Sequence, residues 1–143
     1  MTVLDTSAVI DFLLGSGVAK QVKELIAQEG ELSAPDILVF EVLAVLRREV
    51  LRKTITESRA GGAISDLGDL PITLFPCLPL RQRAWSLRRN LTAADALFVA
   101  LAERLDEPLA TKDGALVAEV SKHATARVLA LHVRNVPPTA PPT

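Results

Sequence analysis

The stretch VLDTSAVI, residues 3–10, indicates the fold class of this chain. A short apolar run ends at Asp5, and apolar residues then recur at helical spacing until two glycines interrupt them. The pattern predicts a strand over residues 2–4 and a helix over residues 7–14. A strand that leads directly into a helix is the first half of a βαβ unit, from which parallel sheets are built.

The rest of the chain continues this alternation of short apolar runs and longer helical patterns. Strands are expected over residues 31–33, 72–75, 109–111 and 127–131. Helices are expected over residues 18–28, 56–67, 80–89, 92–105 and 114–121. Another helix is expected to begin at Ser33-Ala34-Pro35-Asp36, which combines an N-cap residue with an early proline, and to run to about Leu51. The order of elements predicts an α/β fold with a mainly parallel sheet.

Length and composition indicate one globular domain. The 143 residues suffice for one core, and residues 1–134 are expected to form it. Residues 135–143 contain four prolines and no apolar pattern, so a disordered tail is expected. The single cysteine, Cys77, fits a reducing cytoplasm and excludes a disulfide within the chain. The longest apolar stretches, residues 37–46 and 96–102, are too short to span a bilayer, so we expect a cytoplasmic protein without a membrane anchor.

Local charge differs from overall charge. The net charge of −1 argues against a protein that coats nucleic acid non-specifically. Two basic clusters are nevertheless dense enough to contact phosphates, although both are equally compatible with solvated helix faces. The clusters are Arg47, Arg48, Arg52 and Lys53, and Arg81, Arg83, Arg88 and Arg89. With four Phe, one Trp and no Tyr, the chain offers few aromatic rings for base stacking.

Two carboxylates lie within apolar helical segments. Glu41 has Ile37, Leu38, Ala44 and Val45 at three- and four-residue spacings, which predicts that its face of the helix packs against the protein. Asp95 is the only charged residue between Asn90 and Glu103. An ionised carboxylate is costly to bury, and a bound cation offsets that cost. For Asp95 an alternative stays open, because Thr92 and Asp95 have the spacing of a capping box.

Two further carboxylates follow predicted strands. Asp5 comes directly after the strand at residues 2–4, and Asp113 follows the strand at residues 109–111. Both positions lie at the carboxyl edge of a parallel sheet, where open α/β folds bind ligands. Each has a simpler explanation, because Asp5 or Thr6 is a good N-cap and Lys112-Asp113-Gly114 is a good turn. Together the four carboxylates favour a site over four unrelated caps.

A cluster of carboxylates predicts a divalent cation. Such groups repel one another and take up protons unless a cation such as Mg²⁺, or Mn²⁺ as a substitute, neutralises them. One or two bound ions activate a water and stabilise charge on an attacked phosphate, which favours phosphodiester hydrolysis. The catalytic and metal-ligating candidates are Asp5, Glu41, Asp95 and Asp113.

At these residues the sequence resembles the PIN-domain family, and more narrowly the VapC-type toxins of type II toxin–antitoxin systems. Residues 3–10 resemble the N-terminal motif, and Glu41 matches the helix glutamate. LTAADA at residues 91–96 and LATKD at residues 109–113 resemble the third and fourth motifs. Ala94 and Phe98 depart from the family pattern, since an aromatic residue and a tyrosine are common there.

The resemblance implies a three-layer α/β/α sandwich, Mg²⁺-dependent endoribonuclease activity on RNA, a small antitoxin that blocks the site, and a homodimer. It further implies that Asp5 and Asp95 are direct ligands, with Thr6 or Thr111 orienting carboxylates. Two other hypotheses stay open at this point. One is a housekeeping PIN nuclease in RNA processing, and the other is a binding module in which metal has only a structural role.

Overall fold

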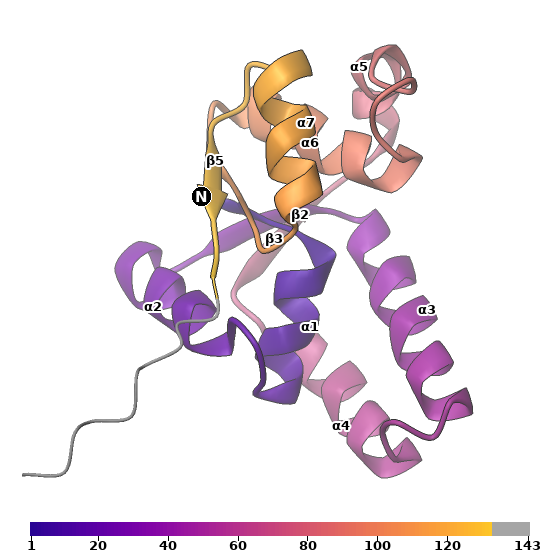
Figure 1. Ribbon diagram of the computed structural model, residues 1–143. Helices are drawn as coiled ribbons and strands as arrows, with labels where there is room; N and C mark the ends of the chain where they lie inside the picture. Colours follow the sequence, from indigo (N-terminus) through magenta and orange to yellow (C-terminus); the bar gives the residue numbers. More distant parts are fainter. Residues whose placement is uncertain (133–143) are drawn as a thin grey trace, which may run out of the picture.

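The computed structural model describes residues 1–132, which form a five-stranded parallel sheet between two layers of helices (Figure 1). The strands lie in the order β3-β2-β1-β4-β5, and every neighbouring pair is parallel. Their bounds are β1 Val3–Leu4, β2 Leu32–Pro35, β3 Ile72–Phe75, β4 Leu109–Thr111 and β5 Val128–Ala130. The predicted α/β/α sandwich with a parallel sheet is confirmed.

The helices divide between the two faces of the sheet (Figure 1). One face carries α1 Thr6–Leu14, α2 Ala19–Glu29, α3 Ile37–Leu51 and α4 Glu57–Leu67. The other carries α5 Arg81–Ser86, α6 Ala93–Leu105 and α7 Gly114–His123. The chain moves one way across the sheet from β1 to β3 and the opposite way from β3 to β5, so right-handed crossovers place the two groups of helices on opposite faces.

Helix α6 explains why residues 96–102 are apolar all round. It packs across β1, β2 and β4, and its buried residues face the sheet on one side and α5 on another. Phe98 is among the largest fully buried side chains of the protein, at 2% exposure. A helix covered on several sides needs apolar residues around most of its circumference. Its first turn, which carries Asp95, lies at the edge of this buried region.

The strand order creates a crevice between β1 and β4. The connection that leaves β1 runs toward β2, whereas the connection that leaves β4 runs toward β5. The two connections therefore diverge at the carboxyl ends of these neighbouring strands, and ligands bind at such switch points in open α/β sheets. Asp5 follows β1 and Asp113 follows β4 by two residues, so the fold brings both to this crevice.

The prediction that a helix begins at Ser33 was wrong. Ser33 lies inside β2, where its N–H donates to the Thr2 carbonyl and its hydroxyl to the carbonyls of Met1 and Thr2. Pairing with β1 and β3 extends this strand through Pro35, and the N–H of Asp36 still bonds to the Phe75 carbonyl at 2.8 Å. Strand pairing on both sides satisfies more backbone groups than a local cap does.

Other predicted elements are present with small shifts at their ends. The helix predicted over residues 80–89 is shorter, since a 3₁₀ turn at Leu78–Leu80 precedes α5, which ends at Ser86. The predicted domain boundary at residue 134 and the tail over residues 135–143 lie outside the described residues. Among residues 1–132, no helix is both long enough and apolar enough to cross a membrane.

Candidate active site

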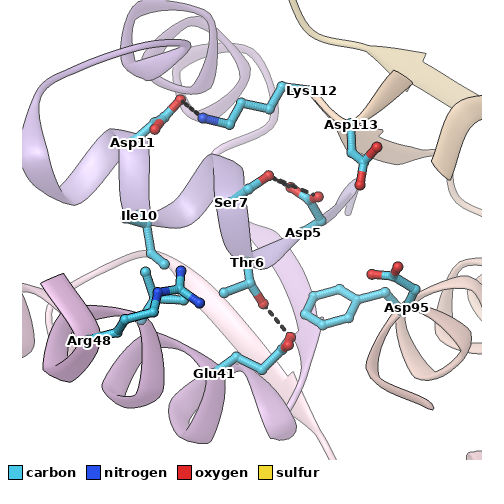
Figure 2. Close-up of a pocket in the computed structure, with 12 residues that line it drawn as sticks. Asp5, Thr6, Ser7, Ile10, Asp11, Glu41, Arg48, Asp95, Lys112 and Asp113 are labelled. Carbon is cyan, nitrogen blue, oxygen red and sulfur yellow. Dashed lines mark hydrogen bonds and ion pairs between the residues drawn. The ribbon is translucent and has the colours of Figure 1, made fainter. Parts of the chain in front are cut away.

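A pocket of about 330 Å³ opens where β1 and β4 end (Figure 2). Its walls come from α1, α3, the first turns of α6, and the turn between β4 and α7. All four carboxylates predicted from the sequence line it: Asp5, Glu41, Asp95 and Asp113. Residues separated by more than one hundred positions therefore share one cavity.

Asp5 is both an N-cap and a wall of the pocket. Its Oδ1 accepts the Ala8 N–H at 3.1 Å, which caps α1, and its Oδ2 accepts the Thr111 hydroxyl at 2.6 Å. The Ser7 hydroxyl lies 3.1 Å from both oxygens. Burial raises the pKa of Asp5, the hydrogen bonds from Thr111, Ala8 and Ser7 oppose this, and the charge of Asp95 adds to the rise. The cap alternative is confirmed, and it coexists with the pocket position.

Asp95 lies in the first turn of α6, where Thr92 and not Asp95 is the N-cap residue. Thr92 caps α6, because its hydroxyl oxygen accepts the Asp95 N–H at 3.2 Å, which is one half of the predicted capping box. The other half, a bond from the Thr92 N–H to the Asp95 carboxylate, is not formed within residues 1–132. Burial raises the pKa of the Asp95 carboxyl, the Thr92 hydroxyl partly opposes this, and the charge of Asp113 adds to the rise. Asp5 is influenced by Asp95, and Asp95 by Asp113, so these three carboxylates form one repelling group.

Glu41 faces the same pocket from α3. The Thr6 hydroxyl donates to its Oε1 at 2.6 Å. Thr6 is therefore placed to orient this carboxylate, the role that the motif resemblance implied. The expectation that the whole face around Glu41 is packed is only partly confirmed. Leu38 is buried, but Glu41 is half-buried and Ala44 is exposed. The carboxylate therefore borders an open cavity, and water reaches it.

Asp113 is exposed and caps α7. Its Oδ1 accepts the N–H groups of Ala115 at 3.0 Å and Leu116 at 3.2 Å. Its Oδ2 makes no hydrogen bond within residues 1–132 and is available to a ligand. The predicted turn is thus a helix cap, and it leaves one carboxylate oxygen for the pocket.

Sequence reasoning missed an ion pair in the pocket wall. The Lys112 Nζ lies 2.7 Å from Oδ2 of Asp11, and the same oxygen accepts the Val18 N–H at 3.1 Å. Asp11 is buried at 8% exposure inside the apolar part of α1. A lone charge in an apolar helix is also the signal that selected Asp95 in the sequence. Lys112 stands directly before Asp113, so its position was also visible in the sequence.

The donor set fits a hard divalent cation. Carboxylate oxygens are the preferred ligands of Mg²⁺, and five carboxylates line this pocket. Asp11 is paired with Lys112, which leaves the four predicted from the sequence, and in this set the charge of Asp95 acts on Asp5 and that of Asp113 acts on Asp95. Within residues 1–132, no three Asp, Glu, His or Cys side chains are arranged to ligate one ion together as they stand. Mg²⁺ usually keeps several waters and takes one or two carboxylates, so the present arrangement is compatible with its binding.

Comparison with known proteins agrees with this geometry. The family model for the PIN domain matches residues 2–122. The chain therefore belongs to the PIN-domain family, as the motif resemblance predicted. A crystal structure, PAE2754 from Pyrobaculum aerophilum, has the same fold, with a TM-score of 0.65 over 87% of this chain and 80% of that one, at 19% identity.

The curated relatives carry a more specific name. Ribonuclease VapC1 of Mycobacterium tuberculosis is 42% identical over 117 residues, which cover 81% of this chain and 88% of the relative. Ribonuclease VapC12 of the same organism is 34% identical over 135 residues, covering 91% of this chain and all of the relative. VapC ribonuclease Mb0985 of Mycobacterium bovis is 38% identical over 113 residues, covering 79% and 86%. Within the family, the chain is similar to the VapC ribonucleases.

Proposed function

We propose that this protein is a divalent-metal-dependent endoribonuclease and the toxin of a type II toxin–antitoxin pair. The observation that carries the proposal is the pocket at the ends of β1 and β4, where four carboxylates meet besides the lysine-paired Asp11. The names of the relatives support RNA as the substrate. The proposal includes the cytoplasmic location expected from the sequence.

The four carboxylates have different parts in this proposal. Asp5 and Asp95 hold the cation most directly, because burial and mutual repulsion make their charges costly without it. Glu41 and the free oxygen of Asp113 bind the ion or its waters. Bound Mg²⁺ or Mn²⁺ supplies a water of lowered pKa and neutralises charge on the attacked phosphodiester.

Two threonines keep these carboxylates in place. The Thr111 hydroxyl donates to Asp5, and the Thr6 hydroxyl donates to Glu41, each at 2.6 Å. Both threonines belong to regular elements, β4 and α1, so the donors are rigidly held. Groups that orient metal ligands typically change metal affinity or activity by about 10- to 100-fold when removed.

Cleavage of RNA by the purified protein tests the proposal. We expect cleavage of total cellular RNA in Mg²⁺, loss of cleavage in EDTA, and recovery on addition of Mg²⁺ or Mn²⁺. Asp5→Asn and Asp95→Asn are expected to abolish cleavage. Asp69→Asn is the matched control, because Asp69 is exposed in the turn after α4 and does not line the pocket. Cleavage that is unchanged in Asp5→Asn and Asp95→Asn would refute the assignment of the site.

The toxin role needs its own test. Expression of the wild type, but not of Asp5→Asn, is expected to arrest growth, and a small protein encoded beside the gene is expected to relieve the arrest. RNA cleavage without growth arrest would favour a housekeeping nuclease in RNA processing. Absence of any metal-dependent cleavage would instead favour a metal-stabilised binding module.

The surface of α3 supports a protein partner. Three large apolar side chains near its start, Val39, Phe40 and Leu43, are 40%, 66% and 44% exposed. Apolar residues gathered on one exposed face mark interaction surfaces more often than isolated ones do. We infer that an antitoxin, a second copy of the chain, or both bind in this part of the molecule. Light scattering after gel filtration, with and without the antitoxin, measures which complexes form.

A further inference from the structure

Helix α3 brings a positive charge to the same pocket as the carboxylates. Glu41, Val45 and Arg48 follow one another at four- and three-residue spacing, so they lie along one face of the helix, and all three line the pocket. In Figure 2, Arg48 lies beside Ile10, at the opposite side of the view from Asp95 and Asp113. One of the two basic clusters of the sequence thus has a member in the cavity.

The guanidinium of Arg48 is largely unused within the protein. Its Nε lies 3.5 Å from Oε1 of the adjacent Glu49, and this carboxylate also accepts the hydroxyl of Thr54. Both Nη atoms of Arg48 lack a hydrogen bond within residues 1–132. The Arg48 side chain is 54% exposed, and exposed ion pairs of this kind contribute little to stability. The contact with Glu49 therefore leaves the guanidinium free to bind another anion.

Lys112, the other cationic side chain in the pocket wall, is already paired. Its Nζ is 2.7 Å from Asp11, and that carboxylate is buried and accepts a backbone N–H as well. Moving Lys112 away leaves a buried charge without its cation, which is costly. Among the described residues that line the pocket, Arg48 is the cation that can reach a ligand without such a cost.

Arg48 is not the counter-ion of the carboxylates either. Within residues 1–132 it makes no ion pair with Glu41, Asp5, Asp95 or Asp113, since its one carboxylate within 4.0 Å is that of Glu49. The carboxylates and the guanidinium line one pocket as separate charges. That arrangement suits a ligand that carries a cation at one side and an anion at the other. Metal-bound RNA has this character, because each nucleotide adds a negatively charged phosphate.

We propose that Arg48 binds a phosphate of the RNA substrate next to the one that is cleaved, and so determines how the strand lies across the carboxylates. A guanidinium suits this role because its planar set of donors matches phosphate oxygens. The inference rests on the proposed ribonuclease function and adds a substrate-binding residue to it. Arg48 acts on the substrate, whereas the carboxylates act through the metal.

Three variants test this inference: Arg48→Ala, Arg48→Lys and the control Arg47→Ala. Arg47 is the neighbouring residue on α3, carries the same charge, and lines a different, apolar groove between α3 and α4. Each variant is assayed for KM and kcat on an RNA oligonucleotide that the wild type cleaves. Binding of the same oligonucleotide is measured by fluorescence anisotropy in an Asp95→Asn background, where cleavage is blocked. Thermal unfolding confirms that each variant is folded.

Arg48→Ala is expected to raise KM and the dissociation constant about tenfold, with a smaller change in kcat, since one charge-assisted contact is lost. The slope of log affinity against log salt is expected to become shallower by about 0.7, as for one lost phosphate contact on a single strand. Arg48→Lys keeps the charge and is expected to recover part of the affinity. Arg47→Ala is expected to behave as the wild type.

Equal effects of Arg48→Ala and Arg47→Ala would overturn the inference while leaving the proposed function intact. A fall in kcat with unchanged RNA affinity and a changed Mg²⁺ requirement would also overturn it, because Arg48 would then act on the metal site. A wild type that cleaves no RNA would refute the proposed function, and this inference with it.

Discussion

The turn between α1 and α2 contains two glycines that differ in the space available for a side chain. Gly15 and Gly17 both have positive φ angles, +67° and +54°. A Cβ added at Gly15 meets nothing within 4 Å, whereas a Cβ added at Gly17 comes within 2.0 Å of Oδ2 of Asp11. We therefore predict that Gly17→Ala destabilises the fold much more than Gly15→Ala.

The size of the loss in the free energy of unfolding follows from the hydrogen bonds that Asp11 loses. Left-handed backbone costs an alanine about 1–2 kcal/mol at either position. At Gly17 the Asp11 side chain must also rotate away, and it then loses the Val18 N–H and the Lys112 Nζ. Loss of hydrogen bonds to a buried charged group costs a further ~1.5–3 kcal/mol. The expected loss in the free energy of unfolding is about 1–2 kcal/mol for Gly15→Ala and about 3–5 kcal/mol for Gly17→Ala.

Urea unfolding followed by far-ultraviolet circular dichroism measures both losses. A second experiment isolates the cause, because Asp11→Ala removes the atom that the new Cβ would strike. In that background, Gly17→Ala is expected to cost no more than Gly15→Ala does. Equal losses for the two glycine variants in the wild type, or an undiminished loss in the Asp11→Ala background, would refute the reasoning.

Three further predictions concern the carboxylates. Asp95→Asn is expected to leave the metal-free protein at least as stable as the wild type, because burial and repulsion disfavour the Asp95 charge. Mg²⁺ is expected to raise the melting temperature of the wild type more than that of the variant. Thr111→Val, which keeps the shape but removes the 2.6 Å hydrogen bond to Asp5, is expected to lower cleavage about 10- to 100-fold in a fixed-time assay. Arg83 donates to Glu103 at 2.7 and 2.9 Å and holds the pKa of that carboxyl below its usual value. The pair stabilises the fold above the ordinary glutamate pKa, and this stabilisation is lost as the pH falls through the lowered pKa of Glu103. Glu103→Gln is therefore expected to cost about 1 kcal/mol in urea unfolding at pH 7, and progressively less as the pH falls below the ordinary glutamate pKa.

Most of the fold was predictable because its signals are local. Each strand is a short apolar run, and each long helix has an apolar face and recognisable ends, such as Thr92 before α6 and Thr56 before α4. The failure at Ser33 has the opposite origin. Its local sequence is a good helix start, but pairing with strands from residues 2–4 and 72–75 outweighs that preference.

The candidate site was predictable for a different reason. A charge in an apolar segment, or directly after a strand, is unusual enough to be seen in one sequence, and this selected Asp5, Glu41, Asp95 and Asp113. The same reasoning named Arg48 only as one member of a basic cluster able to contact phosphates, and did not distinguish it from its neighbours. Its special position depends on the rotation of α3 against α1, which no local pattern encodes.

The sequence by itself determined the fold class, the motifs of the PIN domain and the four carboxylates, because periodicity and misplaced charge are properties of neighbouring residues. The tertiary structure alone decided which charges share a pocket, which of them are already paired, and which remain for a ligand. Those questions depend on distances between side chains far apart in the chain, such as Lys112 and Asp11, or Thr111 and Asp5. Only packing of the helices onto the sheet fixes these distances. The same packing places an arginine in the pocket that contains the four carboxylates.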